Sequence, residues 1–370
     1  MKTAHGLKNG VNRRDFLRIG SISIAAAGML PATRREAKAD VKKLKFTFAC
    51  SPYDRLQALI DGTVQVEGVE LNFLPLEIEE TFWRQLRYQE FDGSEISFSS
   101  YILARSRGDE RFIALPVFTS RIFRHASVYI NTGKGIQRPE DLKGKIVGVP
   151  EYQMTAALWL RGLFQHEYGV LPRDIKWRSG GLEMPGREEK LRLKLPSDID
   201  YAPIPGGKTL SQMLDAGEID ALFTASAPSS FTKGSPNVKR LWENYKDVEA
   251  EYYRKTGIFP IMHAVALKRS VYKENPWVAQ SLYKALLASK NIALKNLQQT
   301  GTLHTALPWL VPEVERTRKI MGDDWWPYGI DKNRKTIEAM CQYSYEQGLA
   351  EKPMKIEDLF APETFTEFKR

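Results

Sequence analysis

From residue 44 onward, stretches with the pattern of a strand alternate with stretches with the pattern of a helix. No other feature of the chain limits its possible folds as strongly. The run LKFTFAC (44–50) is a continuous apolar strand, and a helix pattern follows it at 51–62. The pair repeats as VELNFLP (69–75) and ETFWRQLRYQEF (80–91), and SEISFSS (94–100) then turns from strand to helix. Such alternation predicts an α/β protein with mainly parallel sheets flanked by helices.

Two long extended segments divide this pattern. They cover residues 111–132 and 257–269, and a second strand–helix unit lies between them. A chain of 370 residues is also too long for one ordinary core and favours two lobes of roughly 150 residues each. We therefore predict a first lobe from residues 40–128 and 260–370, a second lobe from residues 129–259, and two extended hinge crossings. This is the architecture of type II periplasmic-binding proteins, in which the ligand lies between the lobes at strand ends and helix N-termini.

The first 39 residues have the pattern of an export signal. Arg13 and Arg14 precede Phe16 and Leu17, and the apolar stretch that follows is too short to span a bilayer. The arginine pair resembles a twin-arginine signal; an ordinary secretory signal and an uncleaved anchor are the alternatives. We expect export machinery to recognise the precursor, a protease to cleave it near Ala39, and the mature protein to be in the periplasm.

Charge, cysteines and histidines exclude some function classes. Residues 1–39 carry eight Lys/Arg and two Asp/Glu, so +6 of the net charge of +9 belongs to the signal and the other 331 residues hold only +3. No basic run suggests a nucleic-acid partner. The two cysteines, Cys50 and Cys341, are either free or paired, because sequence separation does not decide proximity. The five histidines lack metal-ligand spacing, and the sequence predicts no metal and no cofactor.

Several stretches of the chain resemble one family. They include SPYDRLQALIDG, FRHASVYINT, GVPEYQMTAALWLRG, NPWVAQSLYKA and MGDDWWPYGI. Together they look like the 4,5-dihydroxyphthalate decarboxylase family, and the resemblance covers nearly all of the predicted mature chain. The wider superfamily is similar to periplasmic receptors for sulfonate, nitrate and thiamine precursors, with which the phrase DLKGKIVGV is shared. The resemblance thus implies either a carboxy-lyase or a solute receptor.

Polar residues at predicted strand ends and in the crossings are the candidates for ligand binding. Each has a plain structural alternative, since serine and threonine cap helices without any ligand and arginine is common at surfaces. The predicted ligand-binding residues are Tyr53, Arg55, Ser99, Ser100, Arg121, Arg124, His125, Tyr152, Gln153 and Thr155.

The junction after residue 150 raises a specific question, because a strand there turns directly into a helix. The first amides of a helix lack backbone partners and favour an anion. The question is which anion Gln153 and Thr155 meet. We expect a ligand carboxylate, with Arg124 contributing more affinity than the helix dipole because arginine binds carboxylates bidentately.

Two functions remain open. The main prediction is a periplasmic solute-binding protein that captures a small anionic, aromatic carboxylate in the interlobe cleft and delivers it to the membrane permease of an ABC-type importer. The alternative is an enzyme that releases CO2 from a dihydroxylated aromatic dicarboxylate. That chemistry needs an acid or base, and His125, His263 and Asp54 are the candidates.

Overall fold

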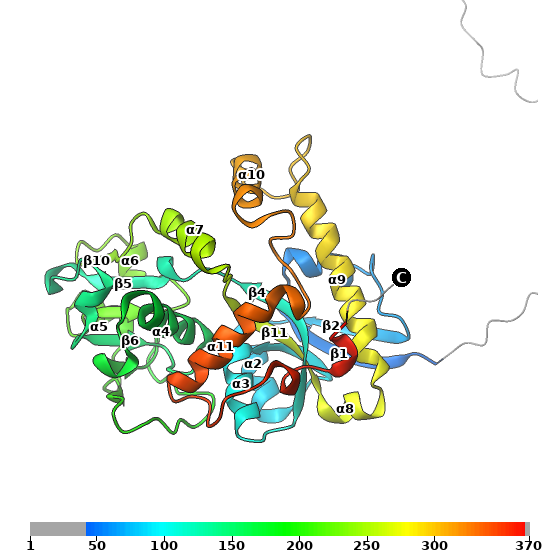
Figure 1. Cartoon of the computed structure of the whole chain (residues 1–370), viewed down its shortest axis with the longest axis horizontal. Helices are drawn as coiled ribbons and strands as arrows, with labels where there is room; N and C mark the ends of the chain where they lie inside the picture. Colours follow the sequence, from blue (N-terminus) through cyan, green and yellow to red (C-terminus); the bar gives the residue numbers. More distant parts are fainter. Residues whose placement is uncertain (1–41, 367–370) are drawn as a thin grey trace, which may run out of the picture. The chain divides into compact units, whose positions relative to one another are not determined.

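The computed structural model describes residues 42–366, which build two sheets with helices packed on them (Figure 1). The predicted signal segment, with Arg13, Arg14 and the cleavage point near Ala39, lies outside the described residues. The strands are β1 Leu44–Cys50, β2 Val69–Pro75, β3 Gly93–Ser97, β4 Phe112–Arg121, β5 Val128–Asn131, β6 Ile146–Val149, β7 Lys176–Ser179, β8 Tyr201–Pro203, β9 Ala221–Phe223, β10 Val238–Arg240 and β11 Ile261–Lys268. The helices are α1 Gln57–Ile60, α2 Ile78–Tyr88, α3 Phe98–Ser106, α4 Thr155–Tyr168, α5 Leu210–Asp215, α6 Ser229–Thr232, α7 Tyr245–Thr256, α8 Arg269–Glu274, α9 Trp277–Leu297, α10 Leu310–Met321 and α11 Arg334–Glu346.

The first sheet has five strands in the order β2-β1-β3-β11-β4, and we call the elements around it lobe 1. Strand β1 pairs in parallel with β2 and β3, as the strand–helix alternation predicts. Strand β11 returns late in the chain and inserts antiparallel between β3 and β4. Helix α9 packs its buried residues on Phe48, Leu115 and Leu267 within one apolar core.

The second sheet has six strands in the order β10-β5-β9-β6-β7-β8, and we call the elements around it lobe 2. Its central strand β9 is buried on both faces, which explains its continuous apolar run. Ala221 and Phe223 belong to the core under α4, whereas Leu222 belongs to the core under α5.

Each sheet combines parallel strands from the alternating units with antiparallel strands from the crossings. Strands β6, β7 and β8 are parallel, whereas β5 is antiparallel to β9 and β10. The two-sheet α/β fold flanked by helices is as predicted. The antiparallel members arise because the chain runs from one sheet to the other and back, so that β11 points against β3.

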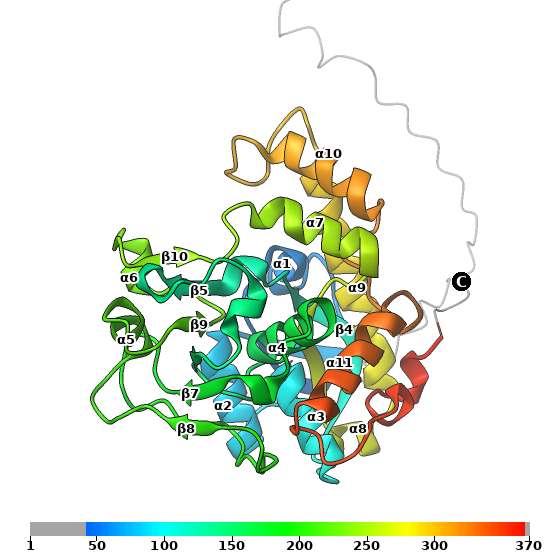
Figure 2. The ribbon, with the colours of Figure 1, turned by 60° about the vertical axis from the view of Figure 1, so that its left-hand side comes forward.

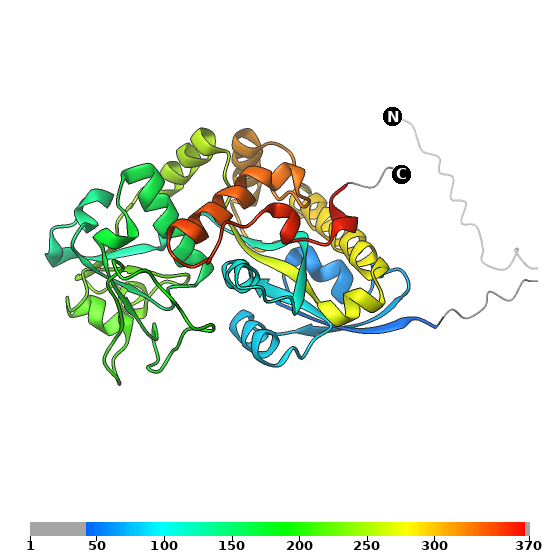
Figure 3. The same cartoon turned by 60° about the horizontal axis from the view of Figure 1, so that its bottom comes forward.

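The chain connects the sheets through 122–127 and again through 257–260. Two further contacts tie the lobes together. Helix α11 packs on both α3 and α4, and α10 packs on α7 (Figures 2 and 3). Within residues 42–366, no helix combines the length and apolar character needed to cross a bilayer.

Candidate functional site

A cavity of about 430 Å³ lies between the lobes, where strands end and helices begin. This volume is within the range of about 300–1,000 Å³ that is common for small-molecule sites. A larger groove of about 770 Å³ runs along α9, but it is lined by lobe 1 alone and lacks the strand ends. The interlobe cavity is lined by Glu77, Ile78, Glu79, Phe82, Ser97, Ser100, Ser120, Arg121, Ile122, Arg124, Met154, Thr155, Ala156, Lys190, Ala225, Ser226, Met262 and His263.

A buried carboxylate holds the one histidine of this cavity. His263 lies on β11 beside β3, and its Nδ1 is 2.7 Å from Oε1 of Glu95. The edge of the Phe82 ring supports the imidazole, with 4.8 Å between the ring centroids. Because Nδ1 is committed to Glu95, Nε2 is the ring nitrogen that a ligand in the cavity can meet.

Glu95 is fully buried and receives hydrogen bonds from several neutral groups. The hydroxyls of Tyr53 and Thr119 donate to Oε1 at 2.7 and 2.9 Å, and the amide of Ser51 donates to Oε2 at 3.3 Å. Burial raises the pKa of Glu95, but His263 and the donating hydroxyls outweigh burial, so the pKa lies below its ordinary value. Glu95 is therefore a carboxylate at neutral pH.

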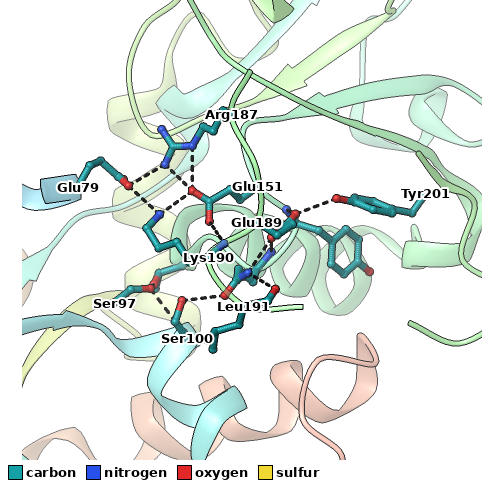
Figure 4. Close-up of polar contacts among 12 residues, drawn as sticks. Glu79, Ser97, Ser100, Glu151, Arg187, Glu189, Lys190, Leu191 and Tyr201 are labelled. Atoms are coloured by element: carbon teal, nitrogen blue, oxygen red, sulfur yellow. Dashed lines mark hydrogen bonds and ion pairs between the residues drawn. The ribbon is translucent and has the colours of Figure 1, made fainter. Parts of the chain in front are cut away.

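The start of α3 and the start of α4 meet at the cavity, one from each lobe. Ser97 and Ser100 are labelled in Figure 4. Ser97 Oγ and Thr155 Oγ1 are 3.0 Å apart, and the Ser99 amide donates to Thr155 Oγ1 at 3.3 Å. Ser100 Oγ donates to Oε1 of Gln153 at 3.2 Å. These hydroxyls join the two lobes through hydrogen bonds instead of pointing freely at a ligand.

At the junction before α4, the helix amides meet a carboxyl group of the chain itself, and burial raises the pKa of this group. Glu189 accepts hydrogen bonds from the amides of Tyr152 and Gln153 and from the side-chain nitrogen of Gln153, the last at 2.9 Å. The Tyr152 ring packs edge-on against Trp177, and its hydroxyl donates to Gln347 O at 3.3 Å. Tyr152 and Gln153 are thus buried behind the cavity, although we predicted ligand contacts for them.

Arg124 is a buried cation at the cavity. Its Nε lies 3.2 Å from Met262 Sδ, and Nη1 donates to Ala225 O at 3.3 Å. Among residues 42–366, no carboxylate lies within ion-pair distance of its guanidinium, and burial lowers its pKa to about 10. Arg124 can therefore receive a ligand carboxylate.

Arg121, the second predicted arginine, supports the hinge. It donates to Asn333 Oδ1 at 2.6 Å and to Phe259 O at 2.7 Å. It lines the cavity, but these contacts join β4 to the return crossing and to the C-terminal segment.

A cluster of alternating charges lies where the lobes meet (Figure 4). Lys190 and Arg187, in the irregular segment between β7 and β8, each contact Glu151 at the end of β6, at 2.5 and 2.6 Å. Both also contact Glu79 of α2 in lobe 1, at 2.7 and 2.8 Å.

The other predicted residues lie away from the cavity. Arg55 donates to Thr119 O at 2.6 Å and stacks on the rings of Tyr53 and Trp326. The side chain of Asp54 is 58% exposed and forms an ion pair with Arg55. Tyr53 reaches only the back of the site, through Glu95.

His125 and Ser99 are also enclosed by the protein. His125 is buried between Trp242 and Tyr252, and neither of its nitrogens has a hydrogen-bond partner among residues 42–366. Burial lowers its pKa to about 4. Ser99 is buried, and its hydroxyl has no partner in the described part of the chain. Cys50 and Cys341 are separate buried thiols, so they do not pair.

Within the described residues, no group of three His, Cys, Asp or Glu side chains is arranged to hold a metal ion. Glu95 and His263 approach such a set, but Glu95 is surrounded by hydrogen-bond donors.

Two relatives decide the family. Over 329 residues the chain is 40% identical to a 4,5-dihydroxyphthalate decarboxylase of Comamonas testosteroni, covering 89% of this chain and 100% of that protein. The chain belongs to the 4,5-dihydroxyphthalate decarboxylase family. A protein of the same name from Pseudomonas putida is 42% identical over 214 residues, covering 58% of this chain and 83% of its own. No family model matches the chain.

Solved structures support the fold of this family member. A periplasmic sulfonate-binding protein of Methylobacillus flagellatus aligns with a TM-score of 0.51 at 13% identity, covering 87% of this chain and 92% of that one. At this identity the likeness shows the fold alone, which is the two-lobed periplasmic-binding-protein fold.

Among the residues of the site, Glu95, Glu79, Arg187 and Lys190 were not predicted from the sequence. Glu95 gave a signal, because it is the one charged residue of strand β3, all of which is buried. Glu79 looks like an ordinary acidic residue in the first turn of a helix. Lys190 lies in a segment without periodicity, so no pattern places it at the cavity.

Proposed function

We propose that this protein is a decarboxylase of an aromatic dicarboxylate that carries a hydroxyl para to the departing carboxylate. The observation that carries the proposal is the buried Glu95–His263 pair, 2.7 Å apart, at an interlobe cavity that also holds Arg124. A receptor has no need of a proton donor held by a buried carboxylate. The names of both relatives agree with this reaction class.

His263 is the proposed proton donor. Its protonated Nε2 gives a proton to the ring carbon that bears the carboxylate, and the para hydroxyl stabilises the resulting cation. The bond to the carboxylate then breaks, its electron pair restores the aromatic ring, and CO2 departs. Glu95 holds the Nδ1 proton and stabilises the imidazolium before transfer. His263 regains a proton from water. With 4,5-dihydroxyphthalate the product is 3,4-dihydroxybenzoate.

Arg124 is proposed to hold the carboxylate that remains. That carboxylate keeps its charge throughout, so binding it orients the ring at no cost to the chemical step.

The test is turnover of 4,5-dihydroxyphthalate by the purified protein, followed as CO2 and 3,4-dihydroxybenzoate. In D2O, the product should carry one deuterium on the carbon that lost CO2. His166→Asn is a matched control, because His166 pairs with Glu346 away from the cavity. Tight binding of this compound without any CO2 would refute the proposal.

A second candidate is an exported receptor for an anionic aromatic ligand that docks on an importer's permease. The arginine pair at 13–14 favours it, because a cytoplasmic enzyme needs no export signal. Replacing both arginines by lysine should leave the protein in the cytoplasm, as fractionation would show. Unchanged periplasmic yield would reject the twin-arginine route. A receptor would also shrink in radius of gyration with its ligand and release no CO2.

A further inference from the structure

The charge cluster at the meeting of the lobes is asymmetric (Figure 4). Lys190 and Glu151 are almost fully buried, with 7% and 1% of their side chains exposed, whereas Glu79 is 52% exposed. Lys190 and Arg187 are thus fixed to lobe 2 by Glu151. Glu79 approaches the same two cations from lobe 1, at the side of the cavity.

Glu79 has the properties of a group that another carboxylate can replace. Burial raises its pKa, but Lys190 and Arg187 outweigh burial and keep the pKa below its ordinary value, so Glu79 is an anion. Within residues 42–366, its carboxylate makes polar contacts with Lys190 and Arg187 alone. Glu79 can leave the cations for water, whereas Glu151 has no water to replace them.

We propose that Lys190 and Arg187 form a second carboxylate subsite, which Glu79 occupies until a dicarboxylate ligand displaces it. The proposal rests on the proposed function for its ligand class, an aromatic dicarboxylate. One ligand carboxylate binds Arg124, and the other replaces Glu79 at Lys190.

This exchange distinguishes the substrate from the product by the number of carboxylates that each carries. The dicarboxylate substrate brings the second anion that Lys190 and Arg187 require when Glu79 leaves. When CO2 departs, the monocarboxylate product has no group for this subsite, and Glu79 returns to it. The return of Glu79 restores an anion to the two cations after cleavage, so that the product is held by Arg124 alone.

The test measures calorimetric binding of phthalate and benzoate to the full-length protein. Phthalate has two carboxylates and lacks the ring hydroxyls, so the proposed reaction does not consume it. In Glu79→Gln, phthalate should bind about five- to tenfold more tightly, the range for a partly exposed carboxylate that contacts two cations. Benzoate affinity should change by less than about twofold, because one carboxylate fills only the Arg124 subsite.

Two variants complete the design. Glu80→Gln is the matched control, because Glu80 lies in the same helical turn but pairs with Arg84 at 2.6 Å. It should change neither affinity. Lys190→Met should abolish the preference for phthalate over benzoate, and thermal melting checks that it is folded.

Weaker phthalate binding in Glu79→Gln would mean that Glu79 only holds the lobes together, and would overturn the proposal. Unchanged phthalate affinity, or no phthalate binding to either protein, would also overturn it. These readouts need no turnover, so an inactive protein would refute the decarboxylase proposal and leave the subsite open to this test.

Discussion

Both lobes bury a carboxylate beside the cavity, and they surround it with opposite kinds of partner. In lobe 1, Glu95 accepts hydrogen bonds from Tyr53, Thr119 and His263. In lobe 2, Glu151 contacts Arg187 and Lys190. The first set includes an imidazole, which can donate a proton, whereas the second set consists of two cations.

Because of this difference, the two carboxylates have different roles at the site. A carboxylate next to an imidazole can support proton transfer, because it orients the imidazole and stabilises its charged form. A carboxylate between two cations can only hold them in place for another anion. We therefore expect variants of the lobe 1 pair to affect turnover, and variants of the cationic groups to affect binding.

The largest expected effect is that of His263→Asn. Loss of a general acid lowers kcat by about 10²–10⁴-fold, whereas phthalate affinity should stay within about threefold, or 0.7 kcal/mol. Steady-state kinetics and calorimetry on the same preparation measure both quantities. If phthalate binding fell as far as kcat, His263 would be a binding residue and the contrast between the lobes would fail.

Glu95→Gln should have the second largest effect. The amide cannot stabilise an imidazolium, so we expect kcat to fall by about tenfold to a hundredfold, less than the loss of the imidazole itself.

The lowered pKa of Glu95 also predicts that the stability of the protein depends on pH. Because the pKa of Glu95 is lowered in the folded state, its contribution to stability is present above the unfolded pKa of about 4.5 and is lost as pH falls through the folded pKa. Denaturant unfolding at pH 7 and at lower pH measures the difference in free energy of unfolding between the wild type and Glu95→Gln. This difference should become smaller at acidic pH. A difference that does not change with pH would contradict an ionised Glu95.

Arg124→Ala should weaken phthalate binding about tenfold to a hundredfold, corresponding to about 1.5–3 kcal/mol for a charge-assisted contact. Arg124→Lys should recover only part of this, since lysine cannot bind a carboxylate bidentately. Arg138→Ala, at a position with 73% of its side chain exposed, is the control. If Arg124→Ala bound phthalate as tightly as the wild type does, the ligand carboxylate would have to bind at another site.

The fold was readable from the sequence because its signals are local. Apolar periodicity located most strands and helices, and the two extended crossings indicated that the chain leaves one sheet and returns to it. The antiparallel insertion of β11 was not readable, because it depends on which edge of β3 the returning strand meets.

The candidate site was only partly predictable for the same reason. Ser100, Arg121, Arg124 and Thr155 were predicted from strand ends and crossings, and they line one cavity. The contact between His263 and Glu95 joins residues 168 positions apart, and no local pattern records it. Likewise, the helix-start rule predicted a ligand carboxylate at Gln153, but the group that accepts hydrogen bonds from Gln153 is Glu189 of the chain itself.

The smallest expected effect concerns Glu249, which lies beside residues 122–127, the first connection between the two sheets. Its Oε1 accepts a hydrogen bond from the Ala126 amide at 3.2 Å and is 4.0 Å from His125 Nδ1. Burial raises the pKa of Glu249 to about 7, while Arg124 and Arg240 only partly oppose the shift. A raised carboxyl pKa gives stability that is complete below the unfolded pKa of about 4.5 and is lost as pH rises through 7.

We therefore expect Glu249→Gln to remove this loss. Between pH 5 and 8, the free energy of unfolding of the wild type should fall relative to the variant by about 1–2 kcal/mol. His125 stays neutral over this range, because burial lowers its pKa to about 4, so it does not mask the effect. Chemical denaturation at both pH values measures it, with Glu251→Gln as the control because Glu251 is 71% exposed on the same helix. If the free energies of unfolding of the wild type and Glu249→Gln changed with pH in the same way, Glu249 would ionise without a loss of stability.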